Sequence, residues 1–119
     1  MYSEIVMDHF QNPRNVGKPG EFNARGVSGN PDAGPFMVLY LDIEGEGIRG
    51  AAFQTYGCGP AIAAGSLLTE MVKGRSVAEA RSITSHVLLD RLGGLPLGKT
   101  HCADLAVSAL RDALGQVGP

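Results

Sequence analysis

Apolar and polar positions divide the chain into a first half typical of strands and a second half typical of helices. Residues 37–43 (MVLYLDI) are rich in β-forming residues and apolar on both faces as far as Leu41, which predicts a well-buried strand. A turn over residues 44–47 separates this run from residues 48–55, so the two segments are expected to form an antiparallel hairpin. Residues 22–29 are ambiguous and compatible with a short edge strand broken at Gly26.

Helix signals lie at the start of the chain and throughout its second half. Ser3 can cap a helix over residues 4–10, and Pro60 suits the first turn of a helix that runs to Val72. Ser76 and Glu79 form a capping box before a short helix, and further helices are expected over residues 85–92 and from about 102 to 114. This order predicts an α+β fold, a small antiparallel sheet with helices on one side, as a single domain over residues 1–119.

Composition narrows the classes of partner. Of the 119 residues, 44% are hydrophobic and 18% charged, which fits a folded globular protein. The net charge is −2 and the basic residues are scattered, so neither nucleic acid nor an anionic membrane is an expected partner. The first ten residues lack the basic-then-apolar order of a signal peptide, and no apolar run approaches the ~20 residues that span a bilayer. We therefore expect a cytoplasmic protein.

Two cysteines offer the main candidate chemistry. Cys58 lies between two glycines in TYGCGPAIAAGS, directly before a predicted helix, and Cys102 follows His101 where the last helix opens. A helix N-terminus favours thiolate over thiol, and two thiolates with an imidazole suit zinc or iron. Free cysteine is also among the most buried residue types, so the residues alone leave a core role, a metal role and a Cys–His hydrolase open.

Three segments resemble the iron–sulfur cluster assembly scaffold proteins of the IscU/NifU N-terminal type. They are YSEIVMDHFQNPRNVG, FQTYGCGPAIAAGSLLTEMVKGRS and LPLGKTHCADLAVSAL, in that order over nearly the whole chain. The resemblance implies a three-stranded antiparallel sheet with about five helices. It also implies a scaffold rather than an enzyme, which holds a two-iron two-sulfur cluster or zinc. The implied partners are a cysteine desulfurase, a chaperone or co-chaperone, and acceptor iron–sulfur proteins.

The resemblance implies that Cys58, His101 and Cys102 are ligands, but the first ligand loop departs from the family. The family has Pro-x-Cys-Gly-Asp there, whereas residues 31–35 read PDAGP, so Ala33 replaces a cysteine and Pro35 replaces the aspartate. Asp32 is the one acid left in this loop and is our candidate replacement ligand.

A chaperone-recognition segment of the family is also partly present. Leu95, Pro96 and Lys99 match its Leu-Pro-Pro-Val-Lys pattern, and Leu97 and Gly98 depart from it. These three matching residues are therefore the candidate contacts for the chaperone.

Three hypotheses follow for the site, and one more for the chain. In the first hypothesis, zinc is bound in a mixed tetrahedral site by Cys58, His101, Cys102 and Asp32. In the second, the same residues hold an iron–sulfur cluster, which is labile and prone to oxidation because a carboxylate is a poor ligand for a sulfide-bridged cluster. Alternatively, the chain binds no metal and acts as a binding or regulatory module for the desulfurase or chaperone. A sulfur-accepting thiol enzyme, with a persulfide on Cys58 or Cys102, is a further class.

Overall fold

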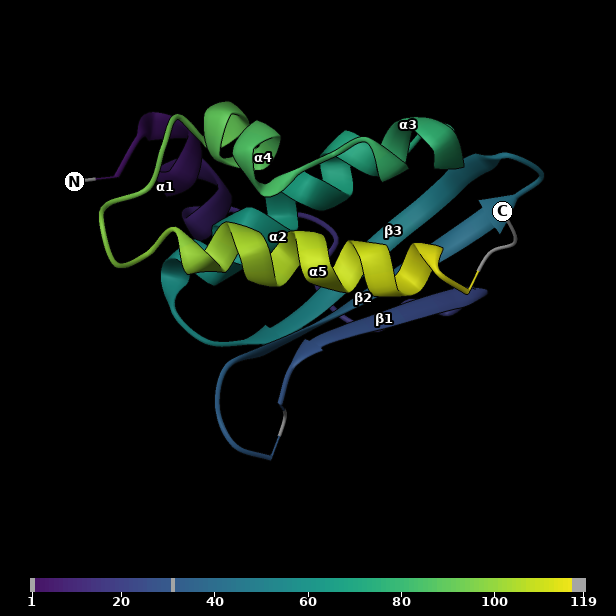
Figure 1. Cartoon of the computed structure of the whole chain (residues 1–119), viewed down its shortest axis with the longest axis horizontal. Helices are drawn as coiled ribbons and strands as arrows, with labels where there is room; N and C mark the ends of the chain where they lie inside the picture. The colour runs from purple at the N-terminus through teal and green to yellow at the C-terminus, as the bar shows by residue number, and fades with distance from the viewer. Residues whose placement is uncertain (1, 31, 117–119) are drawn as a thin grey trace.

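A three-stranded antiparallel sheet forms the base of the structure (Figure 1). The computed structural model describes residues 2–30 and 32–116. Strands β1 (Ala24–Gly29), β2 (Phe36–Glu44) and β3 (Gly47–Tyr56) lie in sequence order, so β2 pairs with both neighbours. Residues 37–41 of β2 are all buried, as expected for a central strand. The predicted hairpin and the α+β fold class are confirmed.

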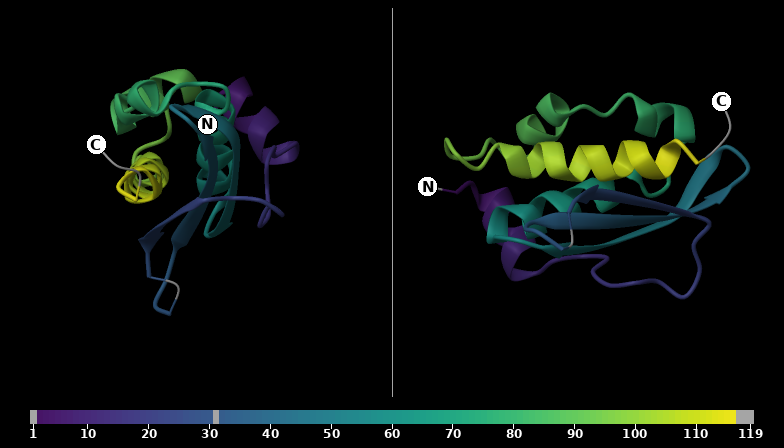
Figure 2. Two further views of the ribbon diagram at one scale, coloured as in Figure 1. Left: turned by 90° about the vertical axis from the view of Figure 1, so that its right-hand side faces the viewer. Right: turned by 60° about the horizontal axis from the view of Figure 1, so that its bottom comes forward.

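Five helices complete the described part of the chain: α1 (Glu4–Gln11), α2 (Gly59–Val72), α3 (Val77–Arg81), α4 (Ser85–Leu92) and α5 (His101–Leu114). Helix α5 packs on β1 and β2, and α2 packs on β3 and α5. In Figure 2 the helices α3, α4 and α5 lie on one side of the sheet, and the segment that follows α1 runs along the other. That segment is tied to the sheet at Phe53, whose N–H donates to Asn15 O and whose O accepts from Gly17 N–H.

The expected helix boundaries are confirmed by their caps. The Ser3 hydroxyl accepts from Val6 N–H at 3.1 Å, and Ser76 and Glu79 form the complete capping box. Helix α4 ends at Gly93, whose φ of 79° is the left-handed conformation that glycine adopts without strain.

The expected break in the first strand is wrong. Strand β1 runs without interruption through Gly26, which pairs with Leu39 of β2. A Cβ atom added at Gly26 would lie 2.0 Å from Ala109 O and 2.4 Å from Ala113 N. Glycine therefore lets the backbone of α5 approach the edge strand closely, and this packing requirement outweighs the low strand propensity of glycine.

Small side chains fill the contact between α2, α5 and the sheet. Ala63 and Ala64 of α2 and Ala103, Ala106 and Ala109 of α5 are fully buried. Larger side chains fill the remaining core, which includes Met37, Leu39, Leu41, Phe53, Leu68, Leu88, Leu92 and Leu110. Alanine and glycine at these positions allow the two helices to lie close to each other and to the strands. Every helix in the described part of the chain is too short or too polar to cross a membrane.

A buried histidine joins α1 to α2. His9 is 5% exposed, and its Nδ1 lies 2.7 Å from Ser66 Oγ, which also accepts from Arg14 N–H at 2.9 Å. The Ser66 hydroxyl proton can therefore be donated to a neutral His9 ring. Burial lowers the pKa of His9 below its ordinary value of 6.5, and Arg14 acts in the same direction, whereas Glu70 and Asp8 act in the opposite direction.

We predict that Gly26→Ala destabilises the fold. The added methyl group would overlap the backbone of α5, so the free energy of unfolding should fall by about 1–3 kcal/mol in urea titrations. Gly50→Ala is the matched control, because a Cβ there would lie 3.5 Å from Asp42 Cβ, an ordinary contact. Equal effects of the two substitutions would contradict the close approach of α5 to β1.

We also predict that His9 makes the free energy of unfolding depend on pH. The folded chain binds a proton at His9 less readily than the unfolded chain, so the free energy of unfolding should fall as the pH drops through about 6.5. His9→Gln should reduce this decline, as measured by urea titrations between about pH 7.5 and 5.5. His86→Gln removes an exposed histidine instead and should keep the decline. An unchanged decline in His9→Gln would refute the assignment.

Candidate metal centre

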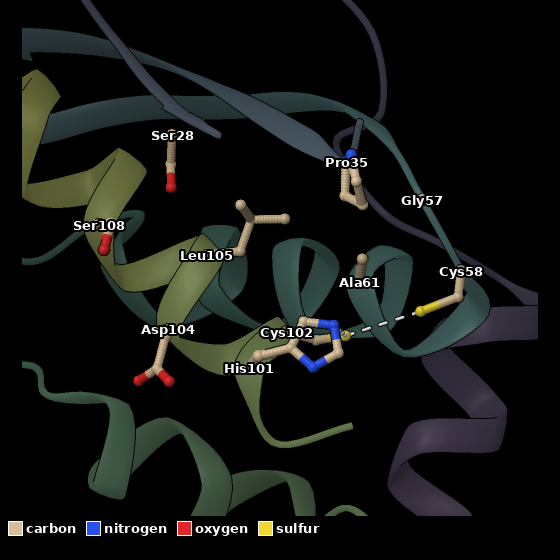
Figure 3. A pocket seen from close by; sticks show the side chains of 10 residues that line it. All are labelled: Ser28, Pro35, Gly57, Cys58, Ala61, His101, Cys102, Asp104, Leu105 and Ser108. Atoms are coloured by element: carbon tan, nitrogen blue, oxygen red, sulfur yellow. Dashed lines mark hydrogen bonds between the residues drawn. The ribbon is translucent and has the colours of Figure 1, made fainter. Parts of the chain in front are cut away.

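The two cysteines of the chain meet where α2 and α5 begin (Figure 3). Cys58 is the N-cap residue of α2, and Cys102 is the second residue of α5. Their Sγ atoms lie 3.6 Å apart, and His101 Nε2 lies 3.8 Å from Cys102 Sγ. The structure thus brings together three of the four candidate ligands, and Asp32 is the fourth.

A cavity of about 390 Å³ opens beside these side chains. The lining residues come from β1, the end of the β1–β2 loop, the start of α2 and one face of α5: Ser28, Pro35, Gly57, Cys58, Ala61, His101, Cys102, Asp104, Leu105 and Ser108. Sequence reasoning missed the contributions of Ser28, Asp104 and Ser108. The helical spacing of residues 101, 104, 105 and 108 could have indicated the face of α5, whereas the contribution of β1 depends on tertiary packing.

Both helices at the cavity begin without a side-chain cap. Ser3, Ser76 and Thr84 cap α1, α3 and α4, but neither Cys58 nor Thr100 accepts a hydrogen bond through its side chain at the start of α2 or α5. The positive ends of two helix dipoles therefore face the region of the thiols, and they favour negatively charged sulfur.

Burial outweighs this effect at Cys102. The residue is 1% exposed, and desolvation raises the pKa of its thiol to about 12. The neighbouring Cys58 acts in the same direction, whereas Lys99 lowers the pKa. Burial therefore opposes the effect of the helix N-terminus at Cys102 in the metal-free chain, and a metal that binds there has to displace the proton of Cys102.

The donor set fits a thiophilic metal in chemistry and in pairwise spacing. Two thiolates bound to zinc at about 2.3 Å in a tetrahedral site are about 3.8 Å apart, and a thiolate and an imidazole nitrogen are about 3.6 Å apart. The distances of 3.6 Å between the Cys58 and Cys102 sulfurs and 3.8 Å between Cys102 Sγ and His101 Nε2 are close to these values. Across residues 2–30 and 32–116, however, no group of three His, Cys, Asp or Glu side chains is already arranged around a metal position. His101 is exposed at this site.

The β1–β2 loop reaches the cavity through Pro35. Pro31 lies outside the described residues. Ala33 and Asp32 are exposed, and neither is among the described residues that line the cavity. The backbone N–H of Asp32 donates to Asn30 Oδ1 at 3.0 Å, and that of Ala33 donates to Asn30 O at 3.0 Å. The loop is therefore a local turn that Asn30 organises, and the role of Asp32 as a ligand stays a prediction.

The segment between α4 and α5 leads directly to the site. Leu95 packs against the core, and Lys99 N–H donates to Pro96 O at 3.0 Å in a turn. Leu97, at the tip, is 98% exposed. Lys99 O in turn accepts from Cys102 N–H at 3.1 Å, so this segment is continuous in structure with the thiol pair.

Comparison with known proteins identifies the family of the chain. The NifU-like N-terminal domain model matches residues 1–117. The chain belongs to the NifU-like N-terminal domain family. It is 48% identical over 114 residues to the iron–sulfur cluster assembly scaffold protein IscU 1 of Archaeoglobus fulgidus, covering 96% of this chain and 74% of the relative. It is 45% identical over 117 residues to the IscU scaffold protein of Escherichia coli, covering 95% and 91%.

Solved structures of the NifU-like type share the fold. A candidate iron–sulfur cluster assembly scaffold protein for the SUF system from Fervidobacterium islandicum superposes with a TM-score of 0.72 at 20% identity, covering 95% of this chain and 96% of that one. The N-terminal NifU-like protein of Brucella abortus gives a TM-score of 0.75 at 17% identity, covering 97% and 92%. At these identities the likeness concerns the fold alone.

Proposed function

We propose that this chain is an iron–sulfur cluster assembly scaffold that binds a two-iron two-sulfur cluster or a zinc ion through Cys58, His101 and Cys102. The contact between the two thiols, with His101 beside them, is the observation that carries the proposal. Membership of the NifU-like family and the identity to IscU scaffold proteins support it. The metal or cluster is cargo of the scaffold, and the proposal includes no catalytic reaction.

The donor count favours zinc over a stable cluster. Two sulfurs, one nitrogen and one carboxylate form a donor set that zinc accepts, whereas clusters prefer four thiolates. Asp32 is the proposed fourth donor, although it is not among the described residues that line the cavity. A cluster held by the same residues would be labile and prone to oxidation.

A second function is a metal-free binding module. Two points favour it: the resemblance implies that Ala33 replaces a ligand cysteine, and the described residues contain no preassembled group of three metal donors. In this case the chain would regulate the sulfur-delivery machinery without carrying cargo.

The proposed partners are a cysteine desulfurase, a chaperone or co-chaperone, and acceptor iron–sulfur proteins in the cytoplasm. Leu95, Pro96 and Lys99 are the proposed chaperone contacts. Exposed Leu97 at the same turn and the hydrogen bond from Cys102 N–H to Lys99 O would place a bound chaperone beside the cargo site.

We predict stoichiometric zinc in protein purified without an affinity tag, as measured by elemental analysis. Cys58→Ala and Cys102→Ala should abolish zinc binding because each removes a thiolate, and His101→Ala and Asp32→Ala should weaken it by removing the nitrogen and oxygen donors. His86→Ala, which removes an exposed histidine of α4, should retain it. Visible absorption after anaerobic reconstitution with iron and sulfide measures cluster binding on the same variants. Stable visible absorption would overturn the preference for zinc. If the folded protein binds neither zinc nor a cluster, both metal hypotheses fail and the metal-free binding module is the remaining function.

We further predict that Ala33→Cys strengthens cluster binding. A thiolate at this position restores the ligand that the family carries, and residue 33 is two positions from Pro35 at the cavity. The measurement is the lifetime of the visible absorption after reconstitution. Ala78→Cys is the matched control, because it adds an exposed cysteine on α3, outside the cavity lining. No gain relative to this control would mean that the loop does not face the site.

A further inference from the structure

The two thiols of the chain form a pair in which one is accessible and the other is protected. Cys58 and Cys102 are 44 positions apart in sequence, yet their Sγ atoms lie 3.6 Å apart. Cys58 is half-buried and lines both the cavity of about 390 Å³ and a second one of about 320 Å³ between α1 and α2. Cys102 borders the first of these cavities as well, but it is only 1% exposed. A reagent from solution therefore reaches Cys58 first.

The backbone around Cys58 can accommodate a covalent bond to Cys102. A disulfide has an S–S distance of about 2.05 Å, so the sulfurs would have to approach by about 1.5 Å. Cys58 lies between β3 and α2, has glycine on both sides, and is not held by a side-chain cap. A Cβ added at Gly57 would make an ordinary contact with Ala61 Cβ at 3.5 Å, whereas one at Gly59 would lie 2.9 Å from the Phe10 ring. Since Cys58 O accepts from Ala61 N–H at 3.0 Å, rotation of the Cys58 side chain with a small shift of this connection would close the gap.

We propose that Cys58 and Cys102 form a redox-active dithiol site that reacts with low-molecular-weight disulfides such as glutathione disulfide and closes to an intramolecular disulfide. The chain has two cysteines in all, so no other thiol of the same chain competes for either sulfur. This inference goes beyond the scaffold proposal, because the reaction requires neither metal nor cluster.

The reaction proceeds in two exchange steps. Cys58, after loss of its proton, attacks one sulfur of glutathione disulfide, forms a mixed disulfide and releases one glutathione thiolate. Cys102 then attacks the Cys58 sulfur, forms the Cys58–Cys102 bond and releases the second glutathione, and the Cys102 proton passes to that leaving thiolate. Two protein thiols lose two electrons and two protons in total, and glutathione disulfide gains them as two molecules of glutathione.

The test exposes metal-free, fully reduced protein to glutathione disulfide and follows intact mass, free thiols and peptide masses. We expect the wild type to lose both free thiols, to lose the mass of two hydrogen atoms, and to yield a disulfide-linked peptide pair. Cys102→Ser and Cys102→Ala should lose their single thiol and retain one glutathione. Cys58→Ser should keep its thiol, because Cys102 is buried.

A matched control keeps two cysteines but moves one of them. Cys102→Ser combined with Ser108→Cys places the second thiol at an exposed position of α5, about 9 Å further along the helix axis. This variant should retain two glutathiones and form no internal bond. Far-UV circular dichroism verifies that each variant is folded, and the reaction of each variant in urea gives its unfolded reference.

Several results would overturn the proposal. A wild type that stops at the mixed disulfide would show that Cys102 cannot reach Cys58, and a wild type that does not react or that forms linked dimers would equally refute the pair. Closure in the Ser108→Cys control would mean that chain flexibility rather than the native contact forms the bond. None of these readouts depends on metal binding, so failure here is distinguishable from failure of the scaffold proposal.

Discussion

The close packing of α2 and α5 on one face of the sheet determines where the reactive groups lie. Helix α5 can approach β1 because Gly26 has no side chain. In the same way, α2 can approach β3 because Gly65 has none: a Cβ there would lie 2.5 Å from the Phe53 ring. Buried alanines on both helices maintain this approach along their lengths. Since the two helices begin at the same end of the sheet, their first turns bring Cys58 and Cys102 together.

The same packing exposes the Cys102 thiol to two opposite effects on its pKa. Two helix N-termini without side-chain caps favour thiolates, but the burial that positions Cys102 raises the pKa of its thiol to about 12. A neutral buried thiol is stable without a partner cation, which allows the metal-free chain to fold around it. A metal that binds there has to compete with this proton, so its apparent affinity should rise with pH.

The sequence alone predicted the elements whose signals are local. Ser3, the Ser76–Glu79 capping box, Pro60 and the apolar run of β2 each correspond to an observed element boundary or core position. The continuity of β1 through Gly26 was not predictable, because it depends on the backbone of a helix more than 80 residues later in the chain. Likewise, helix position alone suggested a thiolate at Cys102, whereas its tertiary burial has the opposite effect.

The role of the β1–β2 loop could not be predicted from sequence motifs alone. On the resemblance drawn from the sequence, Ala33 and Pro35 replace a cysteine and an aspartate of the family, and Pro35 lines the cavity although it has no donor atom to offer. With one thiolate fewer, a cargo metal gains less from the site, whereas the contact between the Cys58 and Cys102 sulfurs is unaffected by the loss. On this prediction, the proposed exchange of the remaining thiol pair with a small disulfide competes with a weaker metal site.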